Sequence, residues 1–233
     1  MTIRQKAGYM AINSYFFPSA PSCATIVIQR SEFISSAVKA DDEEQARKFL
    51  ANVKKQHPFA THNCYAFTAE DGKVAKFSDD GEPQGTAGMP IMEVLKNRGF
   101  CNTLIVVTRY FGGVKLGAGG LVRAYSSAAC AALDCAEISQ AVLSDVFSLN
   151  VPYELFSSYE TFIKPLKSKI LSRDFGDKVT LSIAVPTENA EEFNEKTNGF
   201  FSGNPSISRK SGIFISYNNN MKGENSVEKN NRP

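Results

Sequence analysis

Hydrophobic residues recur with two different periods along the first half of the chain, which predicts both helices and strands. Residues 41–56 carry apolar side chains at helical spacing, with Asp41 placed to cap the helix. Residues 103–108, T-L-I-V-V-T, form an unbroken apolar run, which predicts a strand in the middle of a sheet. The other elements predicted in this half are strands at 23–29, 33–38, 62–68 and 73–77, and helices at 89–98 and 121–136.

The second half of the chain has a pattern of its own. A strand is predicted at 142–151, and Thr187 is placed to cap a helix that continues to Thr197. Between and after them we predict a helix at 153–166 and strands at 170–173, 179–185 and 207–217. The order βαββαβ is the ferredoxin-like arrangement.

These patterns predict an α+β protein with a domain boundary near residues 137–140. An N-terminal α/β domain is expected at 13–137 and a C-terminal domain at 141–217. Residues 1–12 are expected to form a flexible extension, and the polar tail 218–233 is expected to be disordered.

Composition excludes few functions for this chain. The 233 residues include 26 Lys and Arg against 24 Asp and Glu, so binding to nucleic acid would have to come from local clusters of charge. Five cysteines without a C-x-x-C pair indicate reduced thiols. No apolar run approaches the roughly 20 residues that span a bilayer, and no signal peptide is evident, so we expect a cytoplasmic protein without membrane contact.

Two glycine-rich segments stand out, and they hold eight of the sixteen glycines. The first is F-S-D-D-G-E-P-Q-G-T-A-G-M-P at 77–90, and the second is T-R-Y-F-G-G-V-K-L-G-A-G-G-L-V-R-A-Y at 108–125. Clustered glycine marks sharp turns or backbone laid close against something else. From Val94 to Leu133 there is no Asp or Glu but there are five cations: Lys96, Arg98, Arg109, Lys115 and Arg123.

The second segment is a candidate site for an anion or a nucleic acid. A strand leads into a loop and then into a helix that begins near Ala118 or Gly119, where free N–H groups and the helix dipole favour negative charge. The candidate residues are Arg109, Tyr110, Lys115, Gly117, Gly119 and Arg123. Neither a Walker A loop nor a G-x-G-x-x-G fingerprint is present, so the glycines could instead serve only tight turns and close packing.

The first segment offers an acidic motif made of Asp79, Asp80, Glu82 and Thr86. Its spacing is not that of a calcium loop, and we expect no metal and no cofactor. A solvated or capping turn is one interpretation of these acids. Ion pairing with the cations of the second segment is another.

Other candidate chemistry is weaker. His62 and Cys64 would share one face of a strand, but no third group completes a nucleophilic site, so a buried histidine is favoured and no catalytic residue is assigned. Aromatic residues close to the basic segment could stack on bases if exposed, although core positions are favoured. They are Phe100, Tyr110, Phe111 and Tyr125.

Both glycine-rich segments, with Y-F-F-P-S-A-P at 15–21 and H-N-C-Y-A at 62–66, resemble the signature of the IMPACT/YigZ family. The resemblance implies an N-terminal domain similar to domain IV of elongation factor G and a C-terminal domain similar to its domain V. The resemblance implies that eukaryotic relatives regulate translation by protein–protein contact in the amino-acid-starvation response. They carry a different accessory domain without a counterpart in these residues, so that partner is not expected here. Members often have K-S-R-F-I where this chain has R-S-E-F-I, so Glu32 replaces a cation.

The favoured hypothesis is a non-enzymatic, translation-associated regulatory protein. It would bind RNA, the ribosome or a translation factor through the glycine-rich basic segment. One alternative is an enzyme acting on a phosphorylated small molecule with a fold like the GHMP kinases, and another is a protein–protein adaptor that uses the acidic turn. The sequence does not indicate an oligomeric state.

Overall fold

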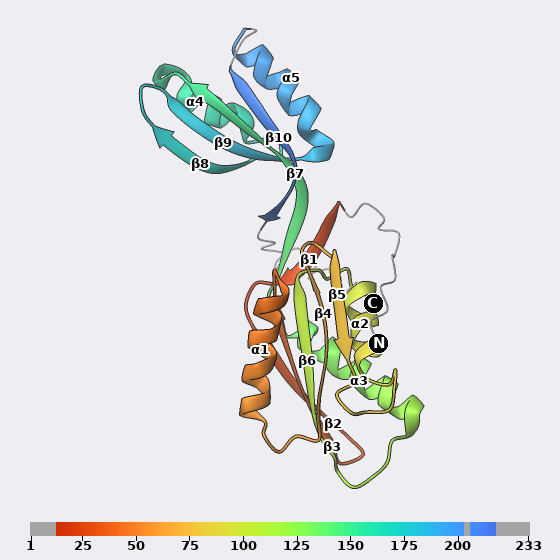
Figure 1. The fold of residues 1–233 in the computed structure, drawn as a ribbon. Helices are drawn as coiled ribbons and strands as arrows, with labels where there is room; N and C mark the ends of the chain where they lie inside the picture. Colours follow the sequence, from red (N-terminus) through yellow and green to blue (C-terminus); the bar gives the residue numbers. More distant parts are fainter. Residues whose placement is uncertain (1–12, 203–205, 218–233) are drawn as a thin grey trace, which may run out of the picture. The chain divides into compact units, whose positions relative to one another are not determined.

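The computed structural model describes residues 13–202 and 206–217 (Figure 1). The expected extension at 1–12 and tail at 218–233 lie outside the described residues. The described residues divide into two compact units: residues 15–140 with Tyr217, called here the N-terminal unit, and residues 13–14 with 141–216, called here the C-terminal unit. The five α-helices described, together with the sheets, make this an α+β protein.

A five-stranded antiparallel sheet organises the N-terminal unit, in the order β2-β3-β6-β4-β5. Its strands are β2 (Ser22–Ile28), β3 (Ser31–Lys39), β4 (His62–Ala69), β5 (Val74–Ser78) and β6 (Thr103–Tyr110). The apolar run at 103–108 is the central strand β6, as predicted. A short strand, β1 (Ser14–Pro18), bonds through Phe16 to the backbone of Gly99 and Cys101.

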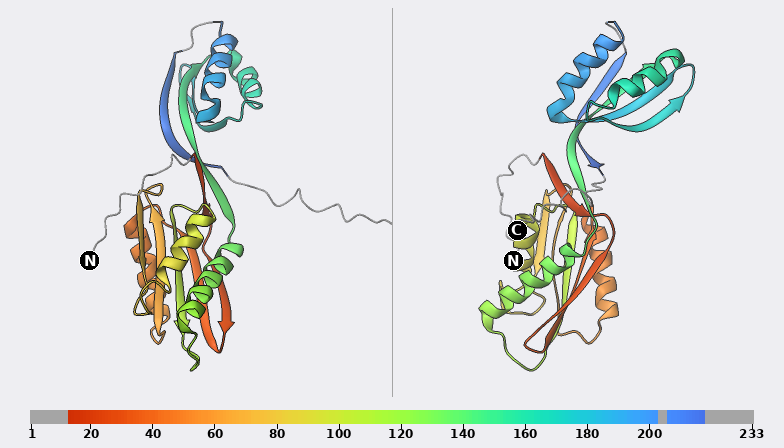
Figure 2. Two further views of the ribbon diagram at one scale, coloured as in Figure 1. Left: turned by 90° about the vertical axis from the view of Figure 1, so that its right-hand side faces the viewer. Right: turned by 180° about the vertical axis from the view of Figure 1, so that it is seen from behind.

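Helices cover both faces of this sheet, and Figure 2 shows α1 on one face with α2 and α3 on the other. They are α1 (Glu43–Gln56), α2 (Gly88–Asn97) and α3 (Gly117–Asp134). Because side chains alternate along a strand, Leu104 and Val106 of β6 pack in the α1 cluster, while Ile105 and Val107 pack beneath α2 and α3. This double burial explains why β6 has no polar position inside its run.

The helix starts differ from the sequence-based expectations in detail. Asp42 caps α1, because its carboxylate accepts the N–H of Gln45 at 2.8 Å, so the prediction of Asp41 as the cap was wrong. Asp41 instead accepts a hydrogen bond from Asn102. The helix α3 begins at Gly117, one or two residues before the start expected near Ala118 or Gly119 and four before the periodic region at 121–136. Its first turn is exposed, so it has no apolar spacing to signal it.

The C-terminal unit has the element order β7, α4, β8, β9, α5, β10, with a 3-10 turn, η1 (Thr187–Asn189), before α5. Strand β7 lies between β10 and β9, and β9 pairs with β8; β1 also joins this sheet. The bounds are β7 (Ile138–Val151), α4 (Tyr153–Ile163), β8 (Lys169–Phe175), β9 (Val179–Pro186), α5 (Ala190–Phe200) and β10 (Ile207–Tyr217). The inner positions of the strands and helices form one core around Phe147, Tyr159 and Phe193.

A buried carboxylate, Asp145, ties β7 to β10 and to the start of α5. It accepts hydrogen bonds from Arg209 at 2.6 Å, Thr187 at 2.9 Å and Ser211 at 2.9 Å. Burial raises the pKa of Asp145, but these hydrogen bonds outweigh burial and hold the pKa below its usual range. Thr187 therefore does not cap the helix as predicted, and α5 begins only at Ala190.

Candidate functional site

The acidic motif turns inward and holds the loop between β5 and α2 in place. The Asp79 carboxylate accepts the backbone N–H groups of Gly85, Ala87 and Gly88 at 2.8–3.0 Å. It therefore satisfies the N–H groups that the start of α2 leaves without partners. Gly88 is required here, since a Cβ atom would lie 2.8 Å from the backbone of Ser78.

Glu82 forms a buried ion pair with Arg109, which links the two glycine-rich segments. Arg109 Nη1 lies 2.5 Å from Glu82 Oε1, and the Tyr125 hydroxyl donates to the same oxygen at 2.8 Å. The guanidinium also lies over the rings of Phe33 and Phe111. Only 5% of Arg109 is exposed, so it is not available to a macromolecular anion at the surface.

The other two members of the acidic motif also have internal partners. Asp80 pairs with Lys54 at 2.9 Å and accepts the N–H of Asn63 at 2.7 Å. Thr86 donates its hydroxyl to the carbonyl of Pro83 at 2.6 Å. Across residues 13–202 and 206–217, no three His, Cys, Asp or Glu side chains gather where they could hold a metal ion.

His62 and Cys64 do not form a nucleophilic pair. His62 Nδ1 hydrogen-bonds to the Asp80 carbonyl at 2.8 Å, and the Cys64 thiol donates to the Asp79 carbonyl at 2.9 Å. Burial raises the pKa of Cys64 to about 12, so the thiol stays protonated and is a poor nucleophile. His62 is therefore hydrogen-bonded as expected, but it is only partly buried.

The cations of the acid-free stretch separate into paired and unpaired residues. Arg98 pairs with Asp134 at 2.6 Å, Lys96 lies 4.0 Å from Glu93, and Arg109 is buried on Glu82. Lys115 and Arg123 are exposed, and neither has an acidic partner among the residues that the structure describes. No carboxylate of the described residues therefore neutralises the charge of these two cations at the surface.

A third exposed cation, Arg30, lies in the tight turn between β2 and β3, next to Gln29, which shares the lining of one hollow with Arg123. The loop after β6 lies directly on this turn: a Cβ atom on Gly112 would be only 2.0 Å from the Arg30 carbonyl group. The Gly112 N–H donates to Ser31 Oγ at 3.2 Å. We call Arg30, Lys115 and Arg123 the basic face. The sequence could not indicate Arg30, because the contact joins segments about 80 residues apart.

The start of α3 within the basic face is bare. Its N-cap residue, Leu116, makes no side-chain cap, and the first turn holds no acidic residue. Gly117 has a φ of +70°, which explains a glycine there. Gly119 has no such reason, since a Cβ atom on it would meet nothing within 4 Å.

A hollow of about 240 Å³ lies between β2 and the first turns of α3. Its lining combines the apolar groups of Ile28, Leu116 and Ala124 with the polar groups of Gln29, Arg123 and Ser127, and Gly120 completes the wall.

Most of the aromatic residues near the basic segment are structural. Phe100 and Tyr125 are buried, and Tyr110 hydrogen-bonds to His57 at 3.1 Å. Phe111 is 48% exposed. Glu32 alternates with the buried Phe33 and so faces away from α3, which keeps this acid off the basic face.

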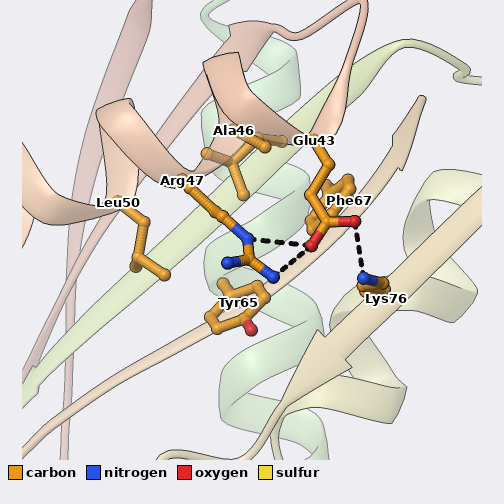
Figure 3. A pocket seen from close by; sticks show the side chains of 8 residues that line it. Glu43, Ala46, Arg47, Leu50, Tyr65, Phe67 and Lys76 are labelled. Atoms are coloured by element: carbon orange, nitrogen blue, oxygen red, sulfur yellow. Dashed lines mark hydrogen bonds and ion pairs between the residues drawn. The ribbon is translucent and has the colours of Figure 1, made fainter. Parts of the chain in front are cut away.

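A second hollow, of about 250 Å³, lies between α1 and the β4–β5 hairpin (Figure 3). Its cations, Arg47 and Lys76, both bind the carboxylate of Glu43, at 2.5 Å each. These hydrogen bonds hold the pKa of Glu43 below its usual range. Because both cations are already bound to a carboxylate, this hollow is less suited to an anion than the basic face.

Family models match both units of the chain. The model described as the Impact N-terminal domain matches residues 29–133, and one described as a domain of unknown function (DUF1949) matches residues 149–204. None of the helices described is long and apolar enough to cross a bilayer. The fold and these matches define a two-unit α+β protein built on an Impact N-terminal domain.

Relatives of known sequence agree over most of the chain. The chain is 36% identical to IMPACT family member YvyE of Bacillus subtilis, with 79% of this chain and 85% of that relative covered. It is 34% identical to IMPACT family member YigZ of Escherichia coli, with 82% and 96% covered. A crystal structure of a hypothetical protein, 33% identical, matches with a TM-score of 0.56 and covers 87% of this chain and 98% of that one. The chain belongs to the IMPACT family.

Proposed function

We propose that this protein is a non-enzymatic regulator in translation that binds RNA, free or within the ribosome, through its basic face. The observation that carries the proposal is that some cations of this region are paired with carboxylates and others are exposed. Arg98 and Arg109 are neutralised by carboxylates, whereas Arg30, Lys115 and Arg123 are exposed around the bare start of α3. Cations without an acidic partner among the described residues, beside the N–H groups of a helix start that no side chain caps, are the contacts that position a phosphate backbone.

Gly119 adds independent support to a ligand at this helix start. A glycine inside a helix destabilises it by roughly 0.5–1 kcal/mol relative to alanine. No side chain or backbone of the described residues lies within 4 Å of the missing Cβ, so internal packing does not require it. A phosphate lying against the helix backbone would require it, because a methyl group would hold the phosphate oxygens away from the N–H groups.

The fold supports a further part of the proposal. In the C-terminal unit, the order β10-β7-β9-β8 with its two helices agrees with a ferredoxin-like domain. We extend the proposal to the family's likeness to domains IV and V of elongation factor G, to domains at 13–137 and 141–217, and to a cytoplasmic location. Two domains like those of a ribosomal factor suit a protein that contacts ribosomal RNA.

The acidic turn is a poor epitope for an adaptor. Asp79, Asp80 and Glu82 each have their carboxylate oxygens engaged inside the N-terminal unit, so they present little free charge to a partner. We therefore do not propose the adaptor function. The enzyme alternative likewise finds no activated nucleophile at Cys64, where the pKa is about 12.

The test is binding of a fluorescein-labelled RNA, and co-sedimentation with ribosomes, by a variant that carries Lys115→Gln and Arg123→Gln. A charge-assisted hydrogen bond contributes about 1.5–3 kcal/mol, so the variant should bind RNA at least roughly tenfold more weakly. The matched control is Lys73→Gln with Lys96→Gln, because both residues lie beside the start of β6, away from the basic face. Absent or salt-insensitive binding by the unmodified protein would overturn the proposal.

A further inference from the structure

The hollow beside the basic face has the lining of a small binding site rather than of a charged patch. Ile28, Leu116 and Ala124 give it apolar walls, and Gln29 and Ser127 bring an amide and a hydroxyl to it. Such a mixture of apolar surface with a few polar groups is typical of sites that recognise one chemical group.

Glycine keeps this hollow open. Gly120 lines it, and a Cβ atom at that position would lie 3.1 Å from the Cβ of Leu116. Any side chain there would occupy the space between α3 and the end of β2. The volume of about 240 Å³ is below the roughly 300–1,000 Å³ of pockets for drug-sized ligands, so the hollow suits a single ring system.

The groups that line the hollow fit a nucleobase. The amide of Gln29 can both donate and accept hydrogen bonds at a base edge, as can the hydroxyl of Ser127. The guanidinium of Arg123 is a flat surface on which a base can stack. Arg123 also belongs to the basic face, so a base in the hollow would have its phosphate beside Lys115 and the bare helix start.

We propose that the hollow between β2 and α3 is a base-binding subsite, and that the RNA bound at the basic face is single-stranded at this point. The inference rests on the proposed function and deepens it by naming the form of the RNA. A base in an A-form duplex is stacked between its neighbours, and the narrow major groove withholds its edge. Only an unpaired base can turn out of the strand and enter a hollow of this size.

The experiment compares a single-stranded decanucleotide RNA with a duplex of the same sequence, by fluorescence anisotropy at one salt concentration. Base stacking contributes about 1–3 kcal/mol per base, so the single strand should bind at least roughly fivefold more tightly than the duplex. Gly120→Met fills the hollow without changing the charge and should remove this preference. Val122→Met is the matched control, because position 122 lies about 200° around the helix from position 120 and is exposed.

Circular dichroism shows whether Gly120→Met folds. If this variant does not fold, cross-linking of the unmodified protein tests the inference instead. A decanucleotide that carries a diazirine on its bases is cross-linked by light, because the carbene inserts into aliphatic and polar side chains as well as aromatic ones, and the adducts are mapped by mass spectrometry. Adducts within residues 28–29 or 116–127 support the inference, and adducts confined to other parts of the chain overturn it.

The failures of the two proposals are distinguishable. If the protein binds no RNA, the proposed function fails and the inference fails with it. If single strand and duplex bind equally, or Gly120→Met binds like Val122→Met, the basic face binds RNA but the base subsite does not exist. Saturable binding of a mononucleotide without any binding of the decanucleotide also overturns the inference.

Discussion

Replacing Glu82 by alanine should destabilise the N-terminal unit by about 3–5 kcal/mol, the cost typical of removing one partner of a buried ion pair. The Glu82 side chain is 4% exposed and that of Arg109 is 7% exposed, so water cannot replace the lost carboxylate. The Tyr125 hydroxyl loses its acceptor at the same time. Among the described residues Arg109 Nε is already buried without a hydrogen-bond partner, and the bond of 3.4 Å from Nη2 to the neutral hydroxyl of Ser31 does not replace a carboxylate. A loss of this size is a large part of the roughly 5–15 kcal/mol that stabilises a typical domain.

Urea denaturation followed by hydrogen exchange and mass spectrometry measures this effect, since it separates peptides of residues 15–140 from those of 141–216. With a urea dependence of about 1–3 kcal/mol per M, the midpoint of the N-terminal unit should fall by about 1–5 M. The midpoint of the C-terminal unit should not change. The chain has no tryptophan, so intrinsic tryptophan fluorescence cannot serve as the probe.

A double-mutant cycle tests whether the ion pair itself is responsible. Arg109→Met removes the charge that Glu82→Ala strands, so the two changes together should destabilise less than the sum of the single changes, by about 2–3 kcal/mol. A Glu82→Ala variant within 1 kcal/mol of the unmodified protein, or purely additive effects, would refute the reasoning. Such a result would mean that the Glu82–Arg109 ion pair does not stabilise the N-terminal unit.

The remaining predictions concern glycines, pH and thiols. Gly112→Ala should lower the melting temperature, because its Cβ atom would lie 2.0 Å from the backbone of the β2–β3 turn. Gly119→Ala should instead stabilise the N-terminal unit by roughly 0.5–1 kcal/mol and weaken RNA binding in anisotropy titrations. The pKa of Asp145 is lowered in the folded state, so this residue stabilises the C-terminal unit at pH values above its unfolded pKa of about 3.9. This stability is lost as pH falls through the folded pKa. Asp145→Asn should therefore reduce the fall of the melting temperature of the C-terminal unit at acid pH. Mass spectrometry after iodoacetamide treatment at pH 8 should find the exposed Cys23 alkylated and Cys64, with its pKa of about 12, unmodified; alkylation of Cys64 in the folded protein would contradict this assignment.

The sequence was most informative where burial imposes a period. The apolar run of β6 predicted the centre of the sheet, because positions 104–107 of this strand are covered by helices on both faces and are all apolar. The start of α3 has no apolar spacing, and the glycine-rich loop placed it only to within two residues, near Ala118 or Gly119. The role of Thr187 could not be read from the sequence, because its partner is Asp145, 42 residues away.

The candidate site divided along the same line. Local chemistry singled out Lys115, Gly119 and Arg123, and the structure places them at an exposed helix start. Local chemistry alone did not distinguish the buried Arg109 from these exposed cations. The ion pair of Arg109 with Glu82 depends on how the two glycine-rich segments meet. Arg30 could not be found at all, since only the close approach of the backbones at Gly112 brings it to the site.

The salt dependence of RNA binding tests the central claim most directly, because it counts the phosphate contacts that a protein makes. The measurement is the slope of log Kobs against log salt concentration for a single-stranded RNA. Removing Lys115 and Arg123 should make this slope shallower by about 1.4, at roughly 0.7 for each phosphate contact with a single strand. The Lys73→Gln and Lys96→Gln control should keep the slope of the unmodified protein. An unchanged slope and affinity for the Lys115→Gln and Arg123→Gln variant would contradict the assignment of the basic face as the RNA-binding surface.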